Sequence, residues 1–282
     1  MRGPGMRKIA RRDILLGGMS LAVLVASRAS ARAEGDLRGH FTQGALIRGR
    51  TTPGAKVSID GKMLGLSSRG DFAFGFAYDR TSAATLRVTV PGGDTETKTL
   101  DIVKREYNVQ RIDGLPDAMV EPPASVLKRI ERDNHLIGAA RARDTAEDWF
   151  AEEFAWPVKG PITGVFGSQR ILNGVPKRPH FGTDIAAGEG APIHAPLGSI
   201  VAMAEHDMYF TGGTVILDHG HGVSTSYLHM SRLDVKVGDR VAKGDPIGAI
   251  GHTGRATGPH LCWRLNWFQE RLDAALVVPP MA

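Results

Sequence analysis

The 282-residue chain has a single cysteine, Cys262, and so it can form no internal disulfide. Its fold must rest on packing alone, which excludes a disulfide-stapled scaffold. Long hydrophobic runs are lacking too. The mostly apolar stretch at residues 14–26 is short of the roughly 20 residues that a membrane-spanning helix needs. The length suits one or two domains with a substantial core.

The first 33 residues have the pattern of an export signal. A basic segment precedes the apolar run, and Ala31-Arg32-Ala33 is a small-x-small cleavage site, which predicts cleavage after Ala33. Residues 10–16 resemble a twin-arginine signal, although Ala10 and Leu16 depart from the usual Ser/Thr and Lys. A general secretory signal is the alternative. Both predict export, to the periplasm, with no membrane span in the mature chain.

Acidic and basic residues are nearly balanced once this segment is set aside. Residues 1–33 hold seven Lys and Arg and one acidic residue, so the net charge of +5 becomes about −1 in the remainder. The high isoelectric point therefore belongs to the signal. No basic footprint for nucleic acid is indicated.

Residues 36–115 are predicted to form a small all-β module. Short runs rich in Val, Ile, Phe and Thr alternate with turn signals such as Asp60-Gly61 and Arg69-Gly70. The runs cover residues 45–50, 56–60, 71–78, 85–90 and 95–103. This spacing favours an immunoglobulin-like β-sandwich. A helical connector over residues 120–153 follows, with Ser125 as the expected N-cap of a helix that continues to about residue 153.

Residues 154–282 turn β-rich and glycine-rich, and three stretches there concentrate possible metal ligands. His180 and Asp184 are four residues apart beside Pro179 and Gly182, which disfavour a helix. On an extended backbone this spacing places both side chains on one face. The second stretch, residues 218–229, ends in Tyr227-Leu228-His229, and the third is Gly258-Pro259-His260-Leu261-Cys262-Trp263-Arg264-Leu265-Asn266-Trp267.

The third stretch alternates as a strand does. Its leucines and tryptophans fall on one face, whereas His260, Cys262, Arg264 and Asn266 fall on the other. A lone cysteine is usually a small buried hydrophobe. Here the alternation places Cys262 on the face of His260, which is a ligand arrangement. His, Asp and Cys are all zinc ligands, and three protein ligands plus water is the catalytic pattern.

These motifs resemble the lysostaphin/LytM-type zinc metallopeptidases, which cut peptide bonds in bacterial peptidoglycan. The resemblance covers residues 154–268 and implies a mainly β, antiparallel catalytic domain with its site in a groove over the sheet. It implies one zinc ion per chain, held by His180, Asp184 and a third ligand that here is Cys262 rather than histidine. His229 and His260 are implied to be catalytic and not ligands.

A cysteine ligand predicts a zinc ion that polarises the scissile carbonyl less strongly than one held by a histidine at this position. Asp184 and a Cys262 thiolate together cancel the two charges of zinc, whereas a His₂Asp set leaves one positive charge. We therefore expect an active enzyme that the thiolate attenuates. The loop at residues 168–178 carries Arg170, Lys177 and Arg178 and could line a groove for an anionic wall peptide.

The sequence leaves two alternatives to the peptidase. A catalytically silent LytM-like domain would bind or activate a cell-wall amidase or another wall hydrolase, but only one family position departs here. The segment 237–248, which contains Lys243, resembles the hairpins of lipoyl and biotinyl carriers. We interpret it as similar β architecture. Among the remaining histidines, His219 and His221 are expected to shape a turn or rim, His194 and His206 to lie in loops, and His252 to lie near the site.

Overall fold

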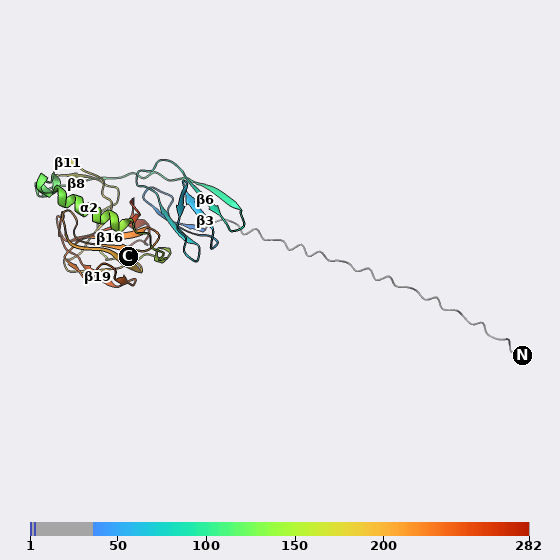
Figure 1. The fold of residues 1–282 in the computed structure, drawn as a ribbon. Helices are drawn as coiled ribbons and strands as arrows, with labels where there is room; N and C mark the ends of the chain where they lie inside the picture. Colours follow the sequence, from blue (N-terminus) through green and yellow to red (C-terminus); the bar gives the residue numbers. More distant parts are fainter. Residues whose placement is uncertain (2, 4–35, 282) are drawn as a thin grey trace. The chain divides into compact units, whose positions relative to one another are not determined.

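The structure is a computed structural model that describes residues 1, 3 and 36–281 (Figure 1). The predicted signal peptide, residues 1–33, lies outside these residues except for Met1 and Gly3. None of the helices in the described part of the chain has the length and apolar character that a membrane crossing requires.

The N-terminal half of the described chain contains two small antiparallel sheets. One has the order β1-β2-β5 and the other the order β4-β3-β6-β7. Their strands are β1 (Asp36–Arg38), β2 (Leu46–Arg50), β3 (Lys56–Ile59), β4 (Lys62–Leu64), β5 (Asp71–Gly75), β6 (Ala84–Thr89) and β7 (Thr95–Leu100). All five runs expected from the sequence contain a strand. Asp60 and Gly61 both have positive φ, as the tight β3–β4 hairpin requires.

A third small sheet joins a segment after these strands to the part of the chain that carries the ligand motifs. β8 (Val109–Ile112) pairs in parallel with β10 (Gln169–Leu172), and β10 pairs with β11 (Val175–Pro176). The segment 168–178 is therefore largely a β-hairpin rather than the loop that we expected. Its register places Arg170 opposite Gln110.

The ligand motifs lie on an eight-stranded antiparallel sheet. Its order is β18-β14-β15-β16-β20-β12-β9, with β21 paired to β20. The strands are β9 (Ile162–Gly164), β12 (Thr183–Ala186), β14 (Ser199–Met208), β15 (Gly212–Asp218), β16 (Val223–Met230), β18 (Arg240–Val241), β20 (His260–Trp267) and β21 (Glu270–Leu272). A smaller sheet, β13-β19-β17, is formed by β13 (Pro192–His194), β17 (Arg232–Leu233) and β19 (Pro246–Ala249). The mainly β, antiparallel architecture is confirmed.

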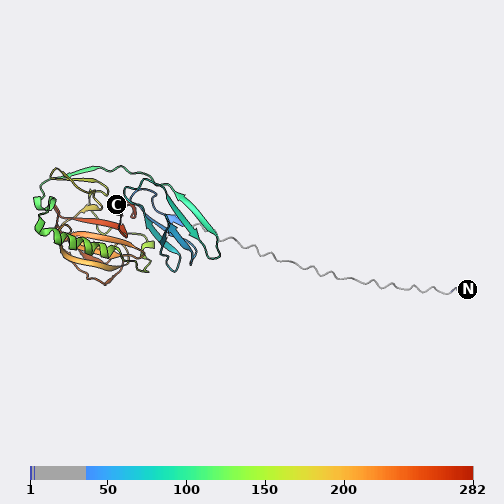
Figure 2. The same ribbon diagram turned by 45° about the horizontal axis from the view of Figure 1, so that its top comes forward.

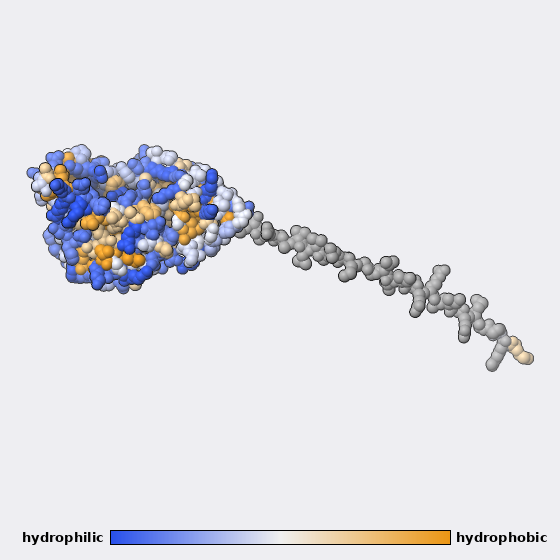
Figure 3. Space-filling model, viewed as in Figure 1, coloured by the Kyte–Doolittle hydropathy of each residue, from blue (hydrophilic) through white to orange (hydrophobic). Residues whose placement is uncertain are grey.

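One face of the large sheet packs into the main hydrophobic core. Tyr227 and Trp263 are paired across β16 and β20, and both side chains are fully buried there. Burial of two large aromatic side chains stabilises this pairing and fixes which face of β20 is turned away from the core. On the face drawn in Figure 3, apolar and hydrophilic side chains are interspersed over the surface.

The predicted connector helix is shorter than expected. α2 (Leu127–Arg141) follows α1 (Asp117–Val120) and the 3₁₀ turn η1 (Ala124–Val126), and it ends twelve residues before the expected end at 153. Ser125 lies in η1 and caps nothing; Val126 is the N-cap residue. The chain leaves the helix after Arg141, and Thr145 donates a hydrogen bond to Asp218. The 3₁₀ turns η2 (Trp149–Ala151) and η3 (Ala274–Leu276) complete the helical elements of the described chain.

One side of α2 packs on the large sheet. Its residues Leu136, Ile137 and Ala140 pack against Met208 and Ile216 of the large sheet. Both ribbon views show α2 lying along the sheet (Figures 1 and 2). The helix therefore forms one wall above the face that is turned away from the core.

Candidate metal centre

The register of the large sheet brings two of the three expected ligands together. β12 and β20 pair so that Asp184 lies opposite Cys262, and Leu228 of β16 lies opposite Cys262 on the other side. The side chain of Cys262 points away from the Tyr227–Trp263 core, as the alternation of the strand predicted. Asp184 and Cys262 are therefore direct cross-strand neighbours on one face.

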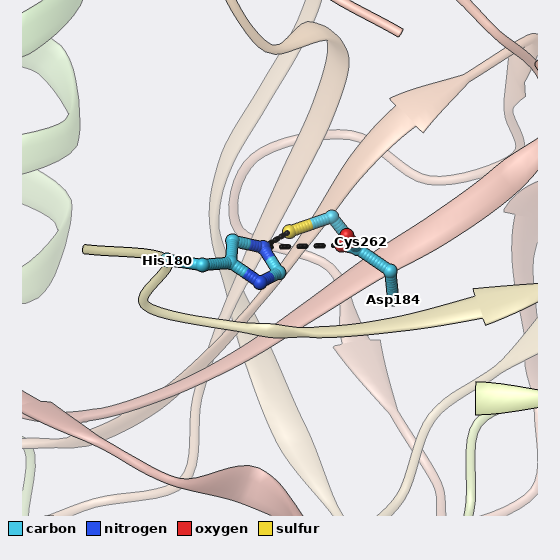
Figure 4. Close-up of side chains that lie close together, drawn as sticks. All are labelled: His180, Asp184 and Cys262. Carbon is cyan, nitrogen blue, oxygen red and sulfur yellow. Dashed lines mark hydrogen bonds and ion pairs between the residues drawn. The ribbon is translucent and has the colours of Figure 1, made fainter. Parts of the chain in front are cut away.

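His180 approaches the pair from the segment before β12. Its backbone is held on both sides, because its amide donates to the Ser168 carbonyl (2.8 Å) and its own carbonyl accepts from the Gly167 amide (2.6 Å). Its Nε2 lies 3.1 Å from Oδ1 of Asp184 and 3.3 Å from Sγ of Cys262 (Figure 4). One ligand atom from each of the three residues lies within 4.8 Å of the other two.

The environment of Asp184 favours its charged form. Burial alone would raise the pKa of this carboxyl, but the adjacent His180 and the charge of Arg170 outweigh burial and hold the pKa well below its usual range. Arg170 Nη2 donates to Oδ2 at 2.8 Å, whereas Oδ1 accepts no hydrogen bond and faces the other two ligand atoms. Gly164, opposite Asp184 on β9, leaves room for this contact, because a Cβ there would lie 2.3 Å from Oδ2.

Cys262 is a buried thiol, and the charges of nearby arginines act on it. Burial raises its pKa to about 12, and the charge of Arg264 opposes that rise. Its side chain is only 1% exposed. A thiol in such surroundings is inert as a free nucleophile, since the thiolate is the reactive form. A bound cation would be needed to hold it deprotonated at neutral pH.

Two further histidines border the three ligand atoms. His260 lies on the cavity face of β20, and its Nε2 is 3.9 Å from Oδ1 of Asp184. The ring of His229 lies 4.8 Å from that of His260. Each ring bonds a backbone carbonyl through Nδ1, His229 to Thr253 and His260 to Gly258, both at 2.8 Å. A carbonyl only accepts, so Nδ1 carries the proton in both and Nε2 is left with a lone pair.

His229 reaches this position through an unusual backbone conformation. Strict alternation along β16 would turn it to the core face of Tyr227. Its φ is +67°, a value rare in residues other than glycine, and this reverses the alternation at the end of the strand. Leu228 and His229 then both line the cavity, while Met230 returns to the core. Burial, with a smaller contribution from His260, lowers the pKa of His229 to about 3, so the ring is neutral at physiological pH.

The five residues line a cavity of about 780 Å³. One wall comes from α2 and the segment after β8, and another from residues 255–260. Arg170, Lys177 and Arg178 of the 168–178 segment line it, so this segment contributes positive charge to the cavity wall.

The other five histidines named from the sequence do not line the cavity, although His252 lies between Gly251, which pairs with His260, and Thr253, which bonds His229. His219 is fully buried; its Nδ1 donates to the Gly198 carbonyl (2.9 Å), and Thr225 donates to its Nε2 (2.8 Å). His221 has a positive φ at the β15–β16 turn, in agreement with a turn-shaping role. His194 and His206 lie in strands β13 and β14, so the prediction that they lie in loops was wrong. His252 pairs with Glu189 and is not among the residues that line the cavity.

Several residues of the cavity wall were not singled out from the sequence. Arg141, Arg255 and Arg271 come from three segments that only the fold brings together, and nothing in their local sequence marks them. Gly164 could have been noticed as a glycine inside a short strand, which often marks a close approach.

Comparison with known proteins identifies the same region. The family model "Peptidase family M23" matches residues 178–274. The peptidoglycan DD-endopeptidase ShyA of Vibrio cholerae is 43% identical over 115 residues, which are 40% of this chain and 26% of ShyA. ShyC of the same organism is 44% identical over 82 residues, 29% of this chain and 19% of ShyC. The chain thus spans about a quarter or less of the length of these curated relatives.

A solved structure extends the likeness beyond the family match. The crystal structure of a protein described as an M23 peptidase from Pseudomonas aeruginosa superposes with a TM-score of 0.64 at 27% identity, over 84% of this chain and 94% of that one. Residues 178–274, which the family model matches, contain the three candidate ligands and the two further histidines. The chain therefore carries a peptidase M23 domain of the lysostaphin/LytM type.

Proposed function

We propose that this protein is a zinc-dependent endopeptidase that hydrolyses peptide bonds of peptidoglycan after export, in the periplasm. One observation carries the proposal: the fold brings Nε2 of His180, Oδ1 of Asp184 and Sγ of Cys262 within 4.8 Å of one another, beside two more histidines. The names of ShyA and ShyC support the substrate class.

The three residues fit a zinc ion. Nitrogen, carboxylate oxygen and thiolate sulfur are all accepted zinc ligands, and a buried carboxylate oxygen without a hydrogen-bond donor is the kind of atom that a cation satisfies. Three protein ligands leave one coordination position open, which is the catalytic rather than the structural pattern. Zinc bound there would supply Lewis-acid polarisation of the scissile carbonyl and of water.

Two arginines offset the charge of the anionic ligands. Asp184 and a thiolate at Cys262 would neutralise the ion, and from the sequence this predicts attenuation. In the fold Arg170 donates to the outer oxygen of Asp184, and the charge of Arg264 acts on Cys262. Both arginines draw negative charge away from the ligand atoms. We propose that they moderate the attenuation that Cys262 causes.

His229 and His260, which are not ligands, would transfer the proton of the attacking water. Thr253 and Gly258 orient the rings so that each Nε2 presents its lone pair. One Nε2 can accept the proton of the attacking water, and the resulting imidazolium N–H can then donate to the developing oxyanion or to the leaving amine. Since four of the five positions keep the family's residue types and the fifth, Cys262, is still a zinc ligand type, a silent domain that only binds a wall amidase or another hydrolase is disfavoured.

The test is zinc content and peptidoglycan digestion measured on the same samples. We expect one zinc per chain in the mature protein, loss of zinc and digestion in His180→Ala, and weaker zinc binding in Cys262→Ser. Cys262→His should bind zinc and digest at least as fast, because it restores one positive charge to the ion. A mature protein that binds no zinc and digests nothing with zinc added would refute the proposal.

A further inference from the structure

Three arginines form a cluster beside the metal centre. Arg264 lies on β20, two residues after Cys262 on the same face of the strand. Arg271 lies on β21 opposite Asn266, and Arg141 is in the last turn of α2. All three line the cavity. We call Arg141, Arg264 and Arg271 the arginine cluster.

The cluster has no carboxylate partner among the residues that the structure describes. Its members form no ion pair there and donate no hydrogen bond to an oxygen, although the charge of Arg264 acts on the Cys262 sulfur. Nε of Arg141, Nε of Arg264 and Nη1 of Arg271 are buried without an acceptor. Arg141 is the extreme case, because only 3% of it is exposed.

Two half-buried arginines elsewhere in this chain do have carboxylate partners. Arg170 donates to Asp184 at 2.8 Å, and Arg105 donates to Asp273 at the same distance. Burying the Arg141 guanidinium without an anion is costly, and the charges of the half-buried Arg264 and Arg271 repel it. Burial and the charges of Arg271 and Arg264 accordingly push the pKa of Arg141 well below its ordinary value. A fold that keeps this arrangement is prepared for an anion.

The neighbouring wall adds positive charge and no available carboxylate. Lys177, Arg178 and Arg255 also line the cavity. Apart from Asp184, its acidic lining residue is Asp133, whose oxygens accept from the Tyr209 amide (2.7 Å) and from Arg132 (3.1 Å). The cavity therefore attracts anions through its whole lining.

The cluster is close enough to the metal centre for one bound peptide to contact both. A Cβ built on Gly182 would lie 2.8 Å from Sγ of Cys262 and 2.9 Å from Cγ of Arg264, so the thiol and the arginine stem flank one spot. A peptide that reaches the ligand atoms would place its neighbouring residues beside the cluster. Guanidinium forks match carboxylates in geometry and can bind them through two parallel hydrogen bonds.

We infer that the arginine cluster is a binding site for a carboxylate of the substrate peptide, next to the bond that is cut. This rests on the proposed function and deepens it, because it names the residues that would hold a carboxylate of the substrate peptide and places them beside the metal centre. The site would select peptides whose free carboxylate lies near the scissile bond over peptides in which that group is an amide.

The experiment compares two probes on the full mature chain in a His229→Ala background, which prevents cleavage. One probe is a soluble cross-linked peptide dimer from peptidoglycan with free carboxylates, and the other is the same dimer with its carboxylates amidated. We expect the acidic dimer to bind at least about tenfold more tightly, as charge-assisted hydrogen bonds predict. This preference should disappear in Arg271→Gln and Arg141→Gln. Arg240→Gln, at an exposed arginine paired with Glu147, should keep it.

Two further readouts make the inference falsifiable. Arg141→Gln should raise the melting temperature of the ligand-free protein, because it removes an unpaired buried charge; a lower melting temperature would show a structural role instead. Equal binding of both dimers would overturn the inference, and so would displacement of the acidic dimer by inorganic phosphate alone at an equal concentration. Zinc content and digestion by the wild type are measured separately, so a failure here is distinguishable from a failure of the proposed peptidase.

Discussion

Gly164→Ala tests whether Asp184 is held for metal binding. The added Cβ would lie 2.3 Å from Oδ2 of Asp184, 2.9 Å from its Cγ and 3.1 Å from Nη2 of Arg170. Ordinary contact begins at 3.4 Å. The carboxylate must therefore retreat by about 1 Å, because the new methyl group is fixed to the β9 backbone.

A shift of that size exceeds what a zinc site tolerates, since ligand distances are kept to within about 0.2 Å. It also breaks the 2.8 Å hydrogen bond from Arg170, and a buried charge-assisted bond contributes about 1.5–3 kcal/mol. We expect zinc affinity to fall about 10- to 100-fold, the usual effect of losing an outer-shell partner. Digestion at limiting zinc should fall in parallel.

The assay is competition for zinc against a chromogenic chelator, with thermal unfolding measured on the same samples. Gly138→Ala is the matched control, because a Cβ at Gly138 meets nothing within 4 Å in the helix that lines the same cavity. An unchanged zinc affinity in a folded Gly164→Ala protein would refute the reasoning. Asp184 would then not be a ligand, or its position would not depend on β9.

Three other outcomes follow from the same structure. His229→Ala should keep its zinc but lose about 10²- to 10⁴-fold in digestion rate, the range for a general acid–base group, and zinc loss would contradict a non-ligand role. Gly138→Ala should raise unfolding free energy by about 0.5–1 kcal/mol in a denaturant titration, since alanine is the better helix former. Burial lowers the pKa of His219 to about 4, below the value of about 6.5 for an unfolded histidine. The neutral buried ring therefore contributes fully to the free energy of unfolding above about pH 6.5, and this stability is lost as the pH falls toward 4. The loss should be about 3 kcal/mol, and a variant His219→Gln should show a shallower pH dependence of stability.

Local patterns in the sequence were sufficient for the strand-containing runs of the N-terminal module and for the two faces of β20. The alternation from His260 to Trp267 predicted which face of β20 carries Cys262, because the two faces differ sharply in hydrophobicity. The ligand set His180, Asp184 and Cys262 came from the resemblance of these motifs to the lysostaphin/LytM-type peptidases, and the chemistry of the three side chains agrees with it. The helix end at Arg141 was not predictable in this way, because contacts with distant residues decide where the chain leaves the helix.

The tertiary structure alone decided how those residues meet. Pairing of Asp184 with Cys262 depends on the register between strands almost eighty residues apart, and the cavity-facing turn of His229 depends on a positive φ that alternation does not predict. The arginine cluster is assembled from a helix and two strands whose local sequences carry no sign of it. All three features depend on contacts between residues far apart in the sequence. The burial and strand pairing that stabilise such contacts exist only once the chain has folded.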